Sequence, residues 1–309
     1  MLMYHGIRFV RLLAPHVPRT VGYRICVLLG LVLWRFNAPS RRKVEDNLRY
    51  ILGPDASPLR LQRAVRDTFI NLSKDYYELV LLGSIGREEI LDSVIASGLD
   101  IVDRELAAGK GVIVVFFHTS GFNLAMQQVL TREWQSSVVT EPLAPPAMRR
   151  LVDGLRSALG IRLITADRAG VRAVLRTLRA NDVVGLAGDR GTSGTGVWVR
   201  LFGHPAFMPA GAAALSLRSG ACIVPMWTCR LADNRILLQV EPPIERWRTG
   251  EFDADVRSIT QALATRFESY IRERPEEWVV ARRVWKEPPA VSEATQVPQS
   301  GPASVAAVL

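Results

Sequence analysis

The sequence predicts an α/β protein in which a central mixed, largely parallel sheet is flanked by helices and preceded by an N-terminal helical segment. After Gly98, short β-branched and aromatic runs alternate with helical stretches, which is typical of parallel sheets. Before Gly98, apolar residues recur at helical spacing. A hydrophobic fraction of 48% in 309 residues is enough to bury a large core.

The N-terminal segment, residues 1–37, mixes five arginines with apolar and aromatic side chains. Its longest apolar stretch, Ile25 to Trp34, is about half of a bilayer span. No small-residue cleavage site follows, so we do not expect a signal peptide. A basic amphipathic segment of this kind can lie in the membrane interface. A pair of helices packed into the core explains the same pattern, and both interpretations stay open.

Between Arg41 and about Leu82 the apolar residues keep a period of 3.6. Gly53-Pro54 ends a first helix, and Ser57 caps a second, longer one.

The strands of the predicted sheet are short apolar runs bounded by glycine or polar residues. Gly111–Phe117, which ends at a histidine, suits a buried strand. Similar runs follow at Ser137–Thr140, Ile161–Thr165, Asp182–Gly188, Val197–Phe202, Ala221–Arg230 and Arg235–Glu241. Helices are predicted at Leu124–Arg132, Pro146–Leu159, Gly170–Arg179, Gly211–Ser219 and Phe252–Arg272. Residues 288–309 show no period and predict a disordered tail, which leaves 38–287 as the globular domain.

The charge balance indicates an anionic partner. Lys and Arg number 39 against 30 Asp and Glu, a formal charge of +9. A membrane surface or a phosphorylated substrate fits this charge. A nucleic acid is not expected, because no recognisable module interleaves aromatic and basic residues. Cys26, Cys222 and Cys229 lie in apolar runs without metal-ligand spacing, so reduced buried thiols, a cytoplasmic location and no metal are expected.

His118 directly follows the run Gly111–Phe117, where functional residues of open α/β sheets gather. Asn123, five residues later at the head of a predicted helix, is placed to orient the imidazole ring. One ring nitrogen would then stay unprotonated and act as a general base. A purely structural histidine remains an alternative.

Two further segments suit ligands. Gly188–Gly196, which contains Asp189 and Arg190, can offer backbone N–H groups and a guanidinium to an anion. It lacks the spacing of a P-loop or of a dinucleotide fingerprint, and a plain turn is the alternative. Farther along, Pro209 at a predicted helix start, with Gly211 and small residues after it, would let a ligand approach a helix N-terminus. Tight helix packing would also explain these small residues.

Taken in order, these segments resemble the lysophospholipid acyltransferase superfamily. The most similar branch is that of the lipid A biosynthesis (lauroyl) and phosphatidylinositol mannoside acyltransferases. The resemblance runs from about Arg41 to Trp285. The matching pieces are Arg42–Leu48, Gly98–Asp100, Gly109–His118, Thr140–Leu143, Gly188–Arg190, Phe202-Gly203, Met208–Gly211, Arg274–Trp278 and Arg282–Lys286.

The resemblance implies a general base and its partner. The family signature is His, four residues, then Asp or Glu, which maps onto His118 and Asn123. An amide can hold the ring tautomer but offers no charge to the imidazolium. Glu141 and Asp189 remain as possible substitutes for the missing acid.

By the same family analogy, Arg156 and Arg190 would hold donor or acceptor phosphates. The matching segments also place Glu141, Asp189, Gly203, Pro209 and Gly211 among the substrate-binding positions.

The function that the resemblance implies is transfer of a fatty acyl group from acyl-CoA or acyl-carrier protein to a hydroxyl of a membrane glycolipid or phospholipid. No cofactor is implied, and the protein would sit peripherally on the cytoplasmic face of the inner membrane. Because Asn123 replaces the family acid, a catalytically impaired relative that binds lipid or acyl donor is the alternative. A serine hydrolase is not supported, because the Gly-x-Ser-x-Gly elbow is missing.

Overall fold

A seven-stranded sheet with the order β1-β9-β8-β2-β5-β3-β4 forms the centre of the computed structural model. The structure describes residues 2–132, 134–190, 195–245 and 248–285. All neighbouring strands are parallel except β8 and β9. The strands are β1 (Val94–Ser97), β2 (Val112–Phe116), β3 (Ser136–Thr140), β4 (Arg162–Thr165), β5 (Val183–Ala187), β8 (Cys222–Arg230) and β9 (Ile236–Val240). The predicted fold class is confirmed.

Helices cover both faces of this sheet, so its central strand β2 is buried along its whole length. Alternate residues of β2 point to opposite faces. Ile113 and Val115 belong to a core shared with α9 (Arg168–Arg179), α10 (Gly211–Ser219) and α11 (Phe252–Glu273). Val112, Val114 and Phe116 belong to a second core. The helices of that face are α5 (Arg87–Asp92), α6 (Leu99–Leu106), α7 (Phe122–Ala125) and α8 (Pro146–Arg156).

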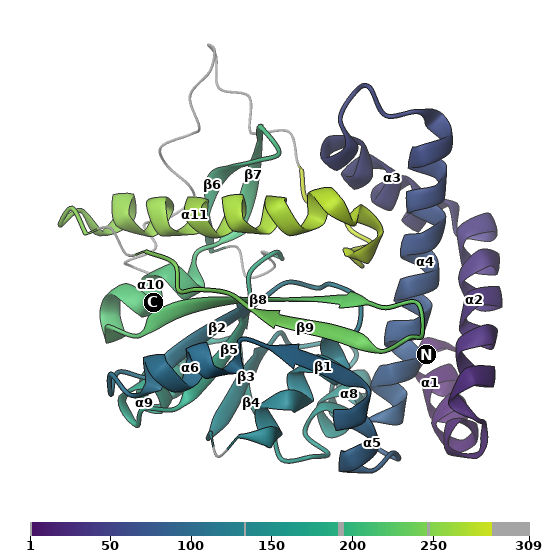
Figure 1. Ribbon diagram of the computed structural model, residues 1–309, viewed down its shortest axis with the longest axis horizontal. Coiled ribbons are helices and arrows are strands. Elements are labelled where there is room, and N and C mark those ends of the chain that lie inside the picture. Colours follow the sequence, from purple (N-terminus) through teal and green to yellow (C-terminus); the bar gives the residue numbers. More distant parts are fainter. Residues whose placement is uncertain (1, 133, 191–194, 246–247, 286–309) are drawn as a thin grey trace.

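The N-terminal helices stand at one end of the sheet. They are α1 (Leu2–Leu13), α2 (Arg19–Phe36), α3 (Ala38–Leu52) and α4 (Pro58–Leu81). Figure 1 shows α4 running past the ends of β8 and β9, with α2 on its outer side. As predicted, the break between α3 and α4 falls at Gly53-Pro54, and the Ser57 hydroxyl caps α4 by accepting from the Arg60 N–H at 3.2 Å.

All seven predicted runs form strands, but one of them leaves the sheet. β6 (Gly196–Leu201) pairs antiparallel with β7 (His204–Pro209) in a separate hairpin. Pro209 therefore ends a strand, and the helix α10 begins two residues later at Gly211. The sequence analysis missed β1, β7, α5 and α6. The predicted tail, 288–309, lies outside the described residues.

Among the described residues, no single helix is long and apolar enough to cross a bilayer. The bent pair α2 and α3, which meet at 93°, passes the same test of length and composition together.

Two glycines allow α2 to lie against α4. A Cβ atom on Gly30 would lie 2.6 Å from the Cα of Ile70, which is backbone and cannot rotate away. A Cβ atom on Gly22 would likewise overlap the side chain of Tyr77. The close contact between α2 and α4 therefore requires glycine, which has no side chain, at both positions.

We expect Gly30→Ala to lower the free energy of unfolding by about 1–3 kcal/mol, the usual cost of overpacking. Gly6→Ala is the matched control, because a Cβ atom there would meet nothing within 4 Å. Thermal unfolding of both variants checks this. Equal melting temperatures for Gly30→Ala and Gly6→Ala would contradict the close packing of α2 on α4.

Candidate active site

The carboxyl ends of four parallel strands meet at one edge of the sheet. Each is followed by a side chain that lines one cavity: His118 after β2, Glu141 after β3, Asp167 after β4 and Arg190 after β5. The cavity has a volume of about 600 Å³. Ligands of open α/β sheets bind in this position.

His118 is held by Asp189, which follows the neighbouring strand. β2 and β5 are parallel and pair Phe116 with Ala187, so the residues two positions beyond each strand end lie side by side. The Nδ1 atom of His118 is 2.7 Å from Oδ1 of Asp189. The backbone N–H of His118 donates to Oδ2 at 3.0 Å. Gly188 permits this approach, because a Cβ atom there would lie 2.6 Å from Cγ1 of Val115.

Trp278 completes the environment of Asp189. Its indole N–H donates to Oδ2 of the carboxylate at 2.9 Å. Burial alone would raise the pKa of Asp189, but the His118 ring and the hydrogen bonds from His118 and Trp278 outweigh it and lower the pKa. Asp189 is therefore ionised at neutral pH. A carboxylate beside Nδ1 keeps the ring proton on that nitrogen and leaves Nε2 as the basic atom.

Asn123 does not hold the His118 ring in this structure. Its Oδ1 atom accepts from Nε of Arg156 at 3.4 Å, and its side chain is buried. Gly121, at φ +81°, turns the chain between His118 and α7. The carboxylate expected at Asn123 from the family pattern is instead supplied by Asp189, one of the two substitutes that the sequence offered.

Arg156 and Arg190 bring positive charge to the cavity. Burial lowers the pKa of Arg156, an effect that Asp153 opposes and Arg190 reinforces. Arg190 lies 3.8 Å from Glu141, a distance too long for a tight ion pair. Two guanidiniums that line one cavity suit a phosphate. Its oxygens would accept hydrogen bonds from N–H groups of Arg156 and Arg190 that the protein itself satisfies only in part.

Elsewhere the cavity is largely apolar. Its apolar lining comes from several elements and includes Leu72, Leu79, Phe116, Phe122, Met126, Val138, Val152 and Leu215. Pro209 and Gly211 also line it, whereas Gly203 lies at the turn of the hairpin with φ +78°. Over the described stretches of the chain, no three His, Cys, Asp or Glu side chains are placed to hold a metal ion. The site thus combines a half-buried histidine paired with a carboxylate, positive charge and an apolar chamber.

A search of protein families matches residues 1–287 to the model described as bacterial lipid A biosynthesis acyltransferase. The chain belongs to this family. It is therefore an acyltransferase.

Individual relatives agree with this assignment. The acyltransferase is 30% identical over 248 residues to the phosphatidylinositol mannoside acyltransferase of Mycobacterium tuberculosis, covering 79% of this chain and 76% of that protein. It is 27% identical over 195 residues to the protein of the same name from Mycolicibacterium smegmatis, covering 60% of this chain and 62% of the relative.

The sequence analysis missed the residues that surround and hold the turn after His118. They come from α4 (Asp75 and Glu78), from the end of β8 (Arg230) and from the segment after α11 (Glu277 and Trp278). The backbone carbonyl of Glu277 accepts from Ser120 N–H at 2.8 Å, and Val279 N–H donates to the His118 carbonyl at 3.0 Å. One signal was present: the segment Arg274–Trp278 matched the family pattern.

The burial of Glu277 predicts a pH-dependent stability for the acyltransferase. Burial raises the pKa of its carboxyl to about 7, although the N–H and the charge of Arg230 oppose the shift and Glu276 adds to it. The protonated form thus favours folding. Its contribution is complete below the ordinary Glu pKa of about 4.3 and is lost as the pH rises through about 7.

We expect Glu277→Gln to remove this dependence, because the amide stays neutral and its oxygen still accepts from the Arg230 N–H. Between pH 5 and pH 8 the wild type should lose about 1–3 kcal/mol more unfolding free energy than the variant. Urea denaturation at both pH values measures this, with the exposed Glu273→Gln as control. A variant that follows the wild type across this range would show that Glu277 does not titrate there.

Proposed function

We propose that this acyltransferase moves a fatty acyl group from a thioester donor to a hydroxyl of a membrane glycolipid, with His118 as the general base. The observation that carries the proposal is the His118–Asp189 pair at a cavity whose lining includes both apolar side chains and arginines. The family and the names of the relatives support a glycolipid acceptor.

In the proposed step, Nε2 of His118 takes the proton from the acceptor hydroxyl as the oxygen attacks the thioester carbonyl. A C–O bond forms, the C–S bond breaks, and the imidazolium returns its proton to the leaving thiolate. Asp189 stabilises the imidazolium, which carries the positive charge in the transition state. Neither a covalent enzyme intermediate nor a cofactor is needed.

The remaining cavity residues divide between the two substrates. We assign the apolar lining to the acyl chain and Arg156 and Arg190 to phosphate groups of donor or acceptor. Either acyl-CoA or acyl-carrier protein meets these requirements, since both carry the acyl thioester at one end of a pantetheine arm and a phosphate at the other.

The alternative function, an impaired relative that only binds lipid or acyl donor, was motivated by Asn123. A missing acid would leave the imidazolium without a charged partner. Because Asp189 lies against Nδ1 of His118, the geometry favours an active base over an impaired one.

We expect His118→Ala to abolish acyl transfer and Asp189→Asn to lower kcat by about 10⁴-fold, the loss seen when the acid of a catalytic triad becomes an amide. Asn123→Asp is the matched control, because it makes the opposite change at the family position; its kcat should stay within about threefold of wild type. Transfer of a radiolabelled acyl group to mannosylated phosphatidylinositol measures all three. A larger loss of kcat in Asn123→Asp than in Asp189→Asn would show that Asn123, and not Asp189, orients the His118 ring.

We further propose that the helices α1 and α2 attach the protein to the cytoplasmic face of the membrane. One side of α2 packs on α4 through Gly22, Tyr23, Cys26 and Gly30. The other side exposes an apolar stripe at helical spacing: Val21, Ile25, Leu28, Leu29, Val32 and Phe36. Arg24 and Arg35 are exposed on the same helix. Continuous exposed apolar surface with cationic neighbours is typical of interfacial helices.

Replacing Ile25 and Leu28 together by Asn should weaken binding to vesicles that contain anionic lipid by at least about tenfold, because each side chain would lose apolar burial. The control replaces Leu59 and Ile95, which are exposed elsewhere, by Asn. Vesicle co-sedimentation at low and high salt measures both. Equal losses in the two double variants would contradict a specific membrane face on α2.

A further inference from the structure

The turn that follows His118 is anchored at every residue. Thr119 hydroxyl lies 2.7 Å from the Thr228 hydroxyl, and Thr119 forms a bridge with Trp278. Ser120 N–H donates to the Glu277 carbonyl. Gly121 N–H donates to Oδ1 of Asp75 at 2.7 Å. These contacts fix the chain between the strand β2 and the helix α7.

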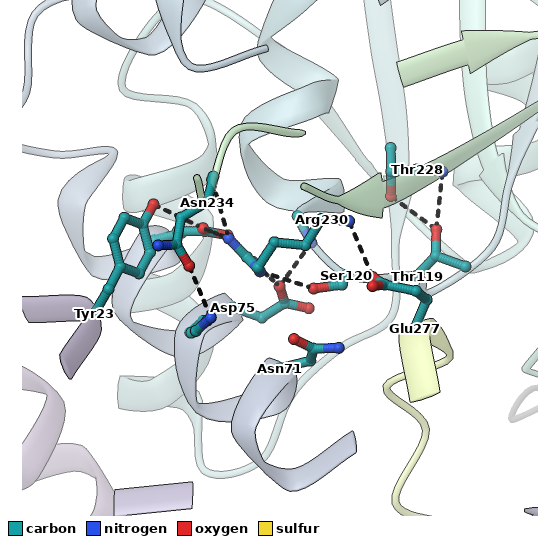
Figure 2. A network of polar contacts seen from close by, with 12 residues as sticks. Tyr23, Asn71, Asp75, Thr119, Ser120, Thr228, Arg230, Asn234 and Glu277 are labelled. Atoms are coloured by element: carbon teal, nitrogen blue, oxygen red, sulfur yellow. Dashed lines mark hydrogen bonds and ion pairs between the residues drawn. The ribbon is translucent and has the colours of Figure 1, made fainter. Parts of the chain in front are cut away.

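Arg230 joins these anchors into one network. Figure 2 shows its guanidinium beside Asp75 and Ser120. Nε donates to the Ser120 hydroxyl at 3.1 Å, and Nη2 donates to Oδ1 of Asp75 at 3.2 Å. Both terminal nitrogens also bind Glu78, Nη2 at 2.9 Å from Oε2. Tyr23 hydroxyl, from α2, donates to the same Glu78 carboxylate at 3.0 Å.

Asp75 is an unusual member of this network because only one of its oxygens is used. Oδ2 is buried and has no hydrogen-bond partner among the described residues. Burial and the nearby Glu78 raise the pKa of Asp75 well above its ordinary value. The raised pKa favours the neutral carboxyl, which avoids a second buried negative charge beside Glu78. The function of Asp75 is then to accept hydrogen bonds at Oδ1.

We propose that Asp75 and Arg230 are positioning residues for the reaction: they hold the 119–121 turn so that His118 keeps its place against Asp189 and the cavity. The inference rests on the proposed role of His118 as base. Neither side chain touches the His118 ring. Their effect passes through the backbone of the turn, where misplacement of a catalytic group by about 1 Å can cost 10²-fold in rate.

Asp75→Ala and Asp75→Asn separate this role from simple stability. Asn keeps an oxygen at Oδ1 for Gly121 and Arg230 and puts its amide nitrogen where Oδ2 has no partner. We expect kcat to fall by about 10- to 100-fold in Asp75→Ala, with the KM for the acyl donor unchanged, and to stay within about threefold in Asp75→Asn. Both rates are measured at a temperature where circular dichroism shows each variant folded.

A second measurement does not require activity. The His118 side chain is 13% exposed, so diethyl pyrocarbonate should modify it slowly in the wild type, and peptide mass spectrometry follows that rate. Asp75→Ala should raise the rate severalfold while Asp75→Asn leaves it unchanged. If the wild type transfers no acyl group, the proposed function fails, but this reactivity still reports whether Asp75 places His118.

Three results would overturn the positioning role. They are a folded Asp75→Ala with wild-type kcat, a loss in Asp75→Asn equal to that in Asp75→Ala, and His118 reactivity that is unchanged in Asp75→Ala. If Asp75→Ala does not fold, Ser120→Ala replaces it, because it removes only the contact from Arg230 Nε and leaves the Arg230–Glu78 pair intact. Wild-type kcat and His118 reactivity in Ser120→Ala would equally refute the proposal.

Discussion

The carboxylate of Asp189 is the point on which the arrangement of the active site depends. It accepts from the backbone and the ring of His118 and from the indole of Trp278. Two of these donors belong to His118 at the exit of β2, and the third comes from the segment after α11. A buried carboxylate without such donors would be protonated or expelled, because burial penalises its charge. One ionised group therefore both joins distant segments and gives the histidine its charged partner.

The position of this acid follows from the register of the sheet. Phe116 and Ala187 are paired across β2 and β5, so His118 and Asp189 follow their strands at equal distances. Adjacent strands lie about 4.8 Å apart, which is within reach of two side chains. The acid on the neighbouring strand therefore reaches the histidine more directly than Asn123, which must turn back from a helix. This geometry explains how the chain lacks the family acid at position 123 and still pairs its histidine with a carboxylate.

The sequence predicted much of this because its signals were local. Seven strands were predicted from short apolar runs. The break between α3 and α4 was predicted from the helical period, from Gly53-Pro54 and from the Ser57 cap. β7 was missed because it begins with His204-Pro205 and ends with Pro209, and prolines argue against a strand. β1 was missed because its four residues lie before Gly98, in the part of the chain where apolar residues recur at helical spacing. The polar network was not readable, because Asp75 on a helix and Arg230 at a strand end look like surface charges until the fold buries them. The order of the strands in the sheet cannot be predicted from local patterns. The contact between Asp189 and His118 follows from that order and therefore appears only in the tertiary structure.

The two faces of α2 link the proposed membrane surface to the site. Its inner face places Gly22 against Tyr77 and sends the Tyr23 hydroxyl to Glu78, which binds Arg230. Its outer face carries the exposed apolar stripe. Removing residues 1–37 would therefore expose one side of α4 and take a donor from the buried network, besides removing the exposed apolar side chains of α2. Loss of activity in such a truncation would not distinguish lost membrane contact from a displaced His118 turn. Substitutions confined to the outer stripe keep the inner face in place, so they test membrane contact alone.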